Sequence, residues 1–169
     1  MLAWLAAGIV AFTSLPATAG IRTHRTSTIK ADRVLIVKGE RQLYLLRNGM
    51  IYRAYSIDLG RDPDGPKIKE GDGRTPEGEY VLDWRNPNSR FYRSIHISYP
   101  NWQDAERARE LGVRPGGLIM IHGLPDHLPV TSRDDLPRDW TEGCIAVNNR
   151  AMDEIWAAVE DGTPIEILP

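Results

Sequence analysis

The fold class is decided by residues 34–57, which read VLIVKGERQLYLLRNGMIYRAYSI. Val34–Val37 and Gln42–Leu46 are short runs rich in aliphatic side chains, and Met50–Ile57 alternates in the manner of a half-buried strand. Asn48-Gly49 joins the second run to the third and favours a type I′ hairpin turn, because both central positions of that turn need a positive φ. The stretch therefore predicts an antiparallel meander within a mainly β domain.

Further elements are expected on the C-terminal side of this meander. Four more strands are predicted at Glu79–Trp84, Ser94–Ser98, Leu118–Ile121 and Ile165–Leu168. Two helices are predicted, a short one at Gln103–Leu111 and a stronger one at Asn149–Glu160, whose apolar residues follow a helical stripe. Two long loops remain, at 60–73 and at 124–139, and a loop as long as the second is often functional.

Composition excludes several classes of protein. The chain has 169 residues, of which 41% are hydrophobic and 26% charged, so one folded domain is expected. The net charge of −2 gives no basic footprint for nucleic acid. Because Cys144 is the single cysteine, an internal disulfide and a zinc site built from several cysteines are both excluded.

The N-terminal residues are typical of an export signal. Leu2–Phe12 is an uncharged apolar run, and Ala17-Thr18-Ala19 follows it as a cleavage pattern. The run is shorter than the roughly 20 residues that span a bilayer. We therefore expect a signal peptide at 1–19, a flexible lead at 20–32, and a domain at 33–169 with no membrane span in the mature chain. An uncleaved anchor helix is the alternative.

The residues around Cys144 could support acyl transfer. A lone cysteine in an exported chain is a candidate reactive thiol, although a small buried hydrophobic residue is the alternative. Gly143 has no Cβ to obstruct the backbone, so the N–H groups of Gly143 and Cys144 could hold an oxyanion. The thiol would need a base, for which His122 at a predicted strand end is the first candidate and His127 the second.

Several motifs, taken in order, resemble the YkuD family of L,D-transpeptidase catalytic domains. A His-Gly pair and a Gly-Cys pair carry the resemblance, together with a T-P-x-G-x-Y segment and a G-T-P-I ending: Ile121-His122-Gly123, Thr141-Glu142-Gly143-Cys144-Ile145, Thr75-Pro76-Glu77-Gly78-Glu79-Tyr80 and Gly162-Thr163-Pro164-Ile165. The Asp139-Trp140-Thr141 lead into the cysteine looks most like the YafK-like branch.

The resemblance implies a β-sandwich-like catalytic domain with Cys144 as nucleophile and His122 as general base; His127 has no family position. It also implies peptidoglycan stem peptides as substrate and cell wall remodelling in the periplasm, with no cofactor and no metal. The reaction would be acyl transfer through a thioester. Alternatives are hydrolysis of the same bond, release of a wall-anchored lipoprotein, and a non-catalytic wall-binding domain with an inert thiol.

Two departures from the family pattern change the expected substrate contacts. Glu142 replaces a histidine and is expected to point away from the sulfur or to accept a hydrogen bond from an imidazole or a substrate amine. Ala146 replaces an arginine, whose role could pass to Arg74, Arg90, Arg93 or Arg133, unless these are surface charges. Trp84, Trp102, Trp140 and Tyr99 either line a groove or pack in the core. The substrate-binding candidates are Gly123, Thr141, Glu142, Trp140, His127 and Arg74.

Overall fold

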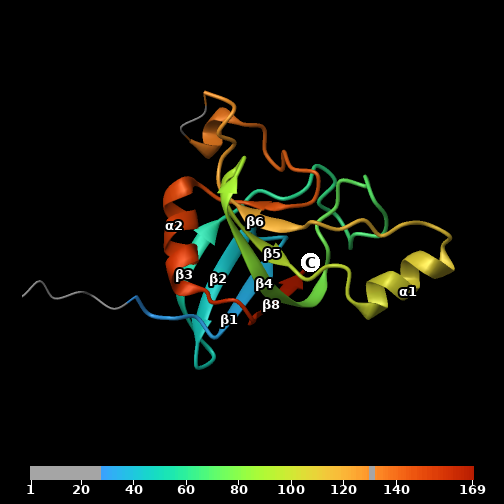
Figure 1. Cartoon of the computed structure of the whole chain (residues 1–169), viewed down its shortest axis with the longest axis horizontal. Coiled ribbons are helices and arrows are strands. Elements are labelled where there is room, and N and C mark those ends of the chain that lie inside the picture. Colours follow the sequence, from blue (N-terminus) through green and yellow to red (C-terminus); the bar gives the residue numbers. More distant parts are fainter. Residues whose placement is uncertain (1–27, 130–131) are drawn as a thin grey trace, which may run out of the picture.

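The computed structural model describes residues 28–129 and 132–169 (Figure 1). The expected signal peptide and residues 20–27 of the expected lead lie outside these residues. The described chain contains one mixed sheet, two α-helices and a single 3-10 turn at Arg133–Asp135. The strands are β1 (Arg33–Val37), β2 (Gln42–Arg47), β3 (Met50–Ser56), β4 (Gly78–Ser89), β5 (Tyr92–Ile97), β6 (Met120–His122), β7 (Ile145–Ala146) and β8 (Thr163–Leu168).

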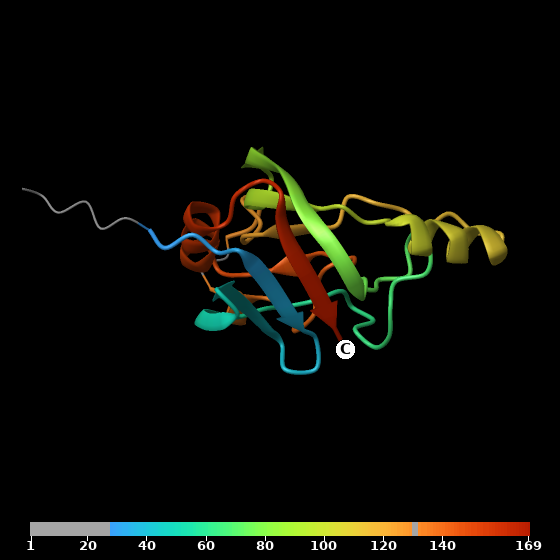
Figure 2. The ribbon, with the colours of Figure 1, turned by 90° about the horizontal axis from the view of Figure 1, so that it is seen from below.

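The expected meander is confirmed. β1 pairs with β2, and β2 with β3, both antiparallel. Asn48 and Gly49 have φ values of 52° and 74°, as a type I′ turn requires. β8 then joins β1 in parallel, with Val34 beside Ile165, and β4 packs on the other side of β8 (Figure 2). The C-terminal strand thus lies in the middle of the sheet, between the meander and the strands that carry the site.

The sheet curls until its two ends meet. Its order is β3-β2-β1-β8-β4-β5-β6-β7. Asp58, just after β3, exchanges two backbone hydrogen bonds of 2.9 Å with Ala146 in β7. The mainly β class is confirmed, and the sandwich-like character takes the form of one sheet folded over its own core. This closure brings the segment after β3 against the residues around Cys144.

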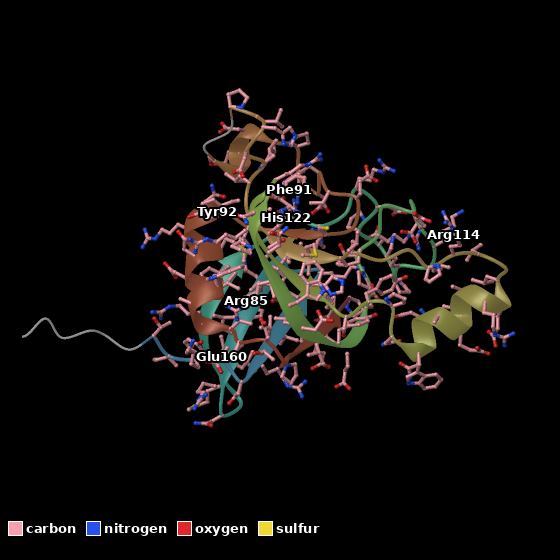
Figure 3. All side chains as sticks on the ribbon, in the orientation of Figure 1. Arg85, Phe91, Tyr92, Arg114, His122 and Glu160 are labelled. Carbon is pink, nitrogen blue, oxygen red and sulfur yellow. The ribbon has the colours of Figure 1, made fainter. Side chains whose placement is uncertain are left out.

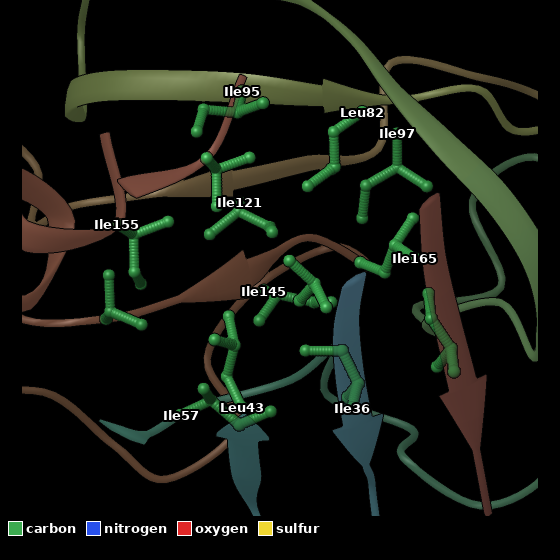
Figure 4. Close-up of a cluster of buried hydrophobic side chains, with 14 of the residues drawn as sticks. Ile36, Leu43, Ile57, Leu82, Ile95, Ile97, Ile121, Ile145, Ile155 and Ile165 are labelled. Atoms are coloured by element: carbon green, nitrogen blue, oxygen red, sulfur yellow. The ribbon is translucent and has the colours of Figure 1, made fainter. Parts of the chain in front are cut away.

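The core fills the inside of the curl. Ile95 and Ile121 on one side face Ile36 and Leu43 on the other, with Ile145 between them, and all five are fully buried (Figure 4). Each such side chain contributes roughly 1.5–3 kcal/mol of burial free energy. Ile145 is therefore a core residue that fixes the position of the cysteine just before it.

Helix α2 (Asn149–Ala158) covers one flank of the curl, with Met152 and Ile155 buried against the core. It begins at Asn148, whose side chain accepts a hydrogen bond from Ala151 N. It ends two residues earlier than expected, because Val159 adopts an extended backbone and is itself buried. Ala31, within the expected lead, is buried and donates its N–H to Ala158 O, so the end of the lead belongs to the domain.

Helix α1 (Trp102–Glu110) stands at the opposite end of the molecule from α2 (Figure 1). Asn101 and Asp104 form a capping box at its N-terminus. Asp104 also accepts a 2.9 Å hydrogen bond from the Tyr80 hydroxyl, which anchors the helix to β4. Neither helix in the described ranges is long and apolar enough to cross a membrane.

Candidate active site

His122 is the last residue of β6 and is 3% exposed. Its Nδ1 lies 2.7 Å from the carbonyl oxygen of Gly123. A carbonyl oxygen can only accept, so Nδ1 carries the proton and Nε2 keeps its lone pair. Burial lowers the pKa of His122 to about 4, although the hydrogen bond to Gly123 opposes the shift. The imidazole is therefore neutral at physiological pH and able to accept a proton at Nε2.

Aromatic rings hold this imidazole in place. The ring of Phe91 lies 4.6 Å from that of His122, and both residues are labelled in Figure 3. The ring of Trp140 lies 5.6 Å from the His122 ring. Gly123 is buried, and its N–H donates to the carbonyls of Phe91 and Arg93, which ties the end of β6 to the β4–β5 turn. The His122 imidazole is therefore fixed by packing on its ring and by a hydrogen bond at Nδ1.

Cys144 lies immediately before β7, and β7 is the strand that pairs with the strand of His122. β7 is parallel to β6, with Ile145 beside Ile121 and Ala146 beside His122. One residue further back, the same register sets Cys144 beside Met120, which is two residues before His122. Because side chains alternate along strands, Cys144 and His122 fall on the same face. The structure thus places Cys144 directly before the strand next to that of His122, and the register extended by one residue puts both side chains on one face of the sheet.

The thiol is neutral in these surroundings. Its Sγ donates to the carbonyl of Leu118 at 3.7 Å, and the residue is partly exposed. Burial raises the pKa of the Cys144 thiol, although the Met120 N–H and the charge of Lys67 oppose the shift. A neutral thiol beside a neutral imidazole predicts proton transfer during the reaction rather than a preformed ion pair.

A tight turn delivers the cysteine. The Thr141 hydroxyl donates to Cys144 O at 2.7 Å and accepts from Gly143 N at 3.1 Å. Gly143 has a φ of 126°, and a Cβ there would lie 2.5 Å from Arg74 O, so only glycine fits. The Gly143 N–H is thus already engaged, which differs from the expected pair of oxyanion donors. The Cys144 N–H makes no hydrogen bond with the described residues and remains available to an oxyanion.

Glu142 points into solvent and pairs with Arg61, both side chains being more than half exposed. This fits the expectation that Glu142 points away from the sulfur. The pairing and the exposure both weaken the effect of its charge on the thiol. His127 lies at the exposed rim, with its ring 6.0 Å from that of Phe91 and edge-on to it.

The remaining aromatic candidates are dispersed. Trp84 stacks on His96, Trp102 is 76% exposed on α1, and Tyr99 is buried with its hydroxyl on Pro115 O. Only Trp140 lies against the catalytic candidates. Its Nε1 is buried and has no hydrogen-bond partner among the described residues.

Among the arginines proposed for the role of the family arginine, Arg74 contacts the turn that carries Cys144. Its backbone oxygen lies against Gly143, and its Nε donates to Asp62 at 3.0 Å. Arg93 pairs with Asp153 on α2, and the Arg90 side chain is exposed. The side chain of Arg133 lies outside what the structure describes.

Sequence reasoning missed three groups around Cys144 and His122: Lys67, Phe91 and the carbonyl of Leu118. Lys67 is 4% exposed and bonds Asp72 at 2.8 Å, yet it stands in a polar loop with no pattern that indicates burial. Phe91 sits in a turn, and a backbone carbonyl carries no signal in sequence. Each of these contacts joins segments distant in the chain, so local patterns could not reveal them.

A family model for the YkuD L,D-transpeptidase catalytic domain matches residues 31–167. The chain belongs to this family. YafK of Escherichia coli K12, for which L,D-transpeptidase activity is proposed, is 34% identical over 133 residues, 75% of this chain and 46% of YafK. The chain thus spans about half the length of this curated relative.

Two solved structures of other proteins have a fold similar to that of this chain. The helical cell shape determining protein Pgp2 of Campylobacter jejuni is 28% identical with a TM-score of 0.60, over 80% of this chain and 46% of Pgp2. Bd1075 of Bdellovibrio bacteriovorus is 25% identical with a TM-score of 0.55, over 85% of this chain and 50% of Bd1075. The family and the fold are therefore established for the described domain.

Proposed function

We propose that the protein is a cysteine-dependent acyltransferase that acts on peptidoglycan stem peptides in the periplasm after export. Membership of the L,D-transpeptidase family supports the reaction class. The observation that supports the proposal is the register of β6 and β7, which, extended by one residue, puts Cys144 and His122 on one face, while Nε2 of His122 makes no hydrogen bond with the described residues. The cell shape role in the name of Pgp2 supports a cell wall setting.

In the first half-reaction, Cys144 Sγ attacks the carbonyl carbon of the amide before the terminal D-alanine. The thiol proton passes to His122 Nε2 as the S–C bond forms. The C–N bond then breaks, and His122 returns the proton to the leaving amine. The Cys144 N–H, which makes no hydrogen bond with the described residues, would stabilise the oxyanion between these steps.

In the second half-reaction, a nucleophile attacks the thioester and gives its proton to His122, while the C–S bond breaks and the sulfur is reprotonated. An amine of another stem gives a crosslink, whereas water gives a trimmed stem. Water acting on a stem joined to a wall-anchored lipoprotein releases that protein. Transfer and hydrolysis share the residues described above, so the products distinguish them.

The test is incubation of the purified protein with disaccharide tetrapeptide, followed by mass analysis of the products. We expect a dimer lacking one alanine if an amine is the acceptor and a tripeptide monomer if water is. Cys144→Ala should abolish both, and His122→Ala should slow them by about 100-fold or more, as for loss of a general base. His96→Gln is the matched control, because His96 pairs with Asp83 on β4 and stacks on Trp84.

The absence of both products, with no covalent adduct on Cys144, would contradict the enzyme proposal. Peptide binding without turnover in that experiment would instead favour the wall-binding alternative. Activity that survives Cys144→Ala would exclude the thioester mechanism.

A further inference from the structure

A cavity of about 540 Å³ lies between the loop after β3 and the segment after α1. We name it the Arg74 cavity. Its lining combines apolar and charged side chains: Ile68, Leu111, Val113, Lys69, Arg74 and Asp62. This combination suits a peptide that offers both aliphatic groups and a charge.

Both walls of the Arg74 cavity lead to the nucleophile. On one wall, the backbone oxygen of Arg74 lies against Gly143. On the other, the segment that begins at Leu111 continues to Leu118, whose carbonyl accepts from Cys144 Sγ. The two walls are joined by Glu70, whose N–H donates to Arg114 O at 2.8 Å and whose carboxylate pairs with the Arg114 side chain (Arg114 is labelled in Figure 3). Both walls of the Arg74 cavity are thus continuous with segments that contact Gly143 or Cys144.

Two cationic side chains of the cavity, Arg74 and Lys69, keep hydrogen-bond donors that no described residue engages. Arg74 bonds Asp62 through Nε, and its two terminal nitrogens make no hydrogen bond with the described residues. The Lys69 ammonium is exposed and has no ion-pair partner in the described ranges. A guanidinium with both terminal nitrogens free can hold a carboxylate through two parallel hydrogen bonds.

The acidic residues of the cavity do not cancel this charge. Asp72 accepts from Lys67 Nζ and from the backbone N–H groups of Ile68, Lys69 and Arg74. Burial opposes ionisation, but these donors lower the pKa of Asp72 to about 2. The Asp72 charge is thus offset by Lys67, and Asp62 is left to offset one of the two remaining cations.

We propose that the Arg74 cavity binds the terminal carboxylate of the peptide substrate, with Arg74 and Lys69 as the recognising residues. The proposal rests on the proposed function for the nature of the peptide. The terminal carboxylate lies one residue beyond the attacked amide, within roughly 3.3–3.6 Å of added chain, so it stays close to the segments that contact Gly143 and Cys144. Ile68, Leu111 and Val113 would then contact the methyl group and the adjacent aliphatic chain.

The test uses Cys144→Ala protein, which binds substrate without turnover, titrated by calorimetry with disaccharide tetrapeptide or with its terminal carboxamide. We expect the carboxamide to bind about 10-fold more weakly, as for loss of one charged contact. Arg74→Met and Lys69→Met, each added to Cys144→Ala, should weaken binding of the carboxylate peptide and reduce this discrimination. Arg74→Lys should restore part of it.

Arg150→Met is the matched control, because Arg150 lies on α2 with its side chain 90% exposed. Equal affinity for the two peptides, or no binding of the carboxylate peptide, would overturn the inference. Lys69 is exposed, so its variant remains informative if Arg74→Met fails to fold. If Cys144→Ala prefers the carboxylate peptide to the carboxamide but the native protein does not turn the peptide over, only the proposed function is rejected. Turnover with no discrimination would reject only the inference.

Discussion

His122 shows how burial sets the chemistry of a residue. An imidazole in water has a pKa near 6.5, whereas that of His122 is lowered to about 4 because the imidazolium would lose its hydration inside the protein. Between pH 6.5 and pH 4, His122 is therefore protonated in the unfolded chain but neutral in the folded chain. Stability must fall as the pH drops through this window.

The first prediction follows from this difference. We expect the free energy of unfolding to decrease by about 3 kcal/mol between pH 6.5 and pH 4 through His122 alone. Urea unfolding of the native protein and of His122→Gln at both pH values measures it, because the variant should lack this part of the decrease. His127→Gln, at the exposed rim, should retain it. Identical pH dependence in the native protein and His122→Gln would contradict the assignment.

The second prediction concerns the thiol. Burial raises the pKa of Cys144, so little thiolate is present at neutral pH. Alkylation by iodoacetamide should therefore be slower at pH 7 than for the same cysteine in urea, and should rise by about tenfold per pH unit up to pH 9. Labelling that is already fast and pH-independent below pH 7 would show a preformed thiolate and reject the neutral pair.

At the scale of elements, one hydroxyl, that of Thr141, holds the turn 141–144 that positions Cys144. Thr141 is 4% exposed and satisfies both Gly143 N–H and Cys144 C=O. Val has the same shape without the hydroxyl, so Thr141→Val leaves two buried groups unpaired.

The third prediction is that Thr141→Val loses about 2 kcal/mol or more of unfolding free energy, since each unsatisfied buried group costs about 1–3 kcal/mol. It should also lower the rate of acyl-enzyme formation. Thr141→Ser keeps the hydroxyl and should lose less than half as much on both measures. Urea unfolding and the rate of product formation test the pair, and equal behaviour of the two variants would show that the hydroxyl does not matter.

The elements differ in how far sequence predicts them. The β2–β3 hairpin and α2 carry local signals, namely Asn48-Gly49 and a helical stripe capped by Asn148, and both formed as expected. β7 was not predicted, because two residues carry no periodicity and their pairing comes from β6 and from Asp58. β4 extends to Ser89 rather than Trp84 because β5 pairs with it beyond a bulge.

The same distinction applies to the site. Cys144 and His122 could be chosen from motif and spacing, and the structure sets Cys144 directly before the strand that pairs with that of His122. The engagement of Gly143 N–H by Thr141, the burial of Lys67 and the ring of Phe91 against His122 depend on how the sheet curls. Contacts set by curvature are long-range, and no window of sequence contains them.

At the scale of the whole molecule, one buried ion pair holds the closure of the sheet beside the catalytic turn. Asp139 is 8% exposed and directly precedes Trp140. Its carboxylate bonds Arg41 Nε at 3.1 Å and Nη2 at 2.8 Å, and also accepts from Leu59 N at 3.0 Å. It thus links the β1–β2 turn, the segment after β3 and the start of the turn that carries Cys144.

The fourth prediction is that Asp139→Ala lowers the unfolding free energy by about 3–5 kcal/mol, because it leaves the Arg41 guanidinium partly buried without its partner. Asp139 has a φ of 53°, which asparagine tolerates well, so Asp139→Asn keeps the backbone and an acceptor for Leu59 N–H and should lose less. Urea unfolding of the three proteins measures the series. Glu106→Ala is the control, because Glu106 pairs with Arg109 on the exposed face of α1 and its loss should change stability by no more than about 0.5 kcal/mol. If Asp139→Ala unfolds like this control, the Arg41–Asp139 pair does not hold the closure, and the backbone pairing of Asp58 with Ala146 must suffice on its own.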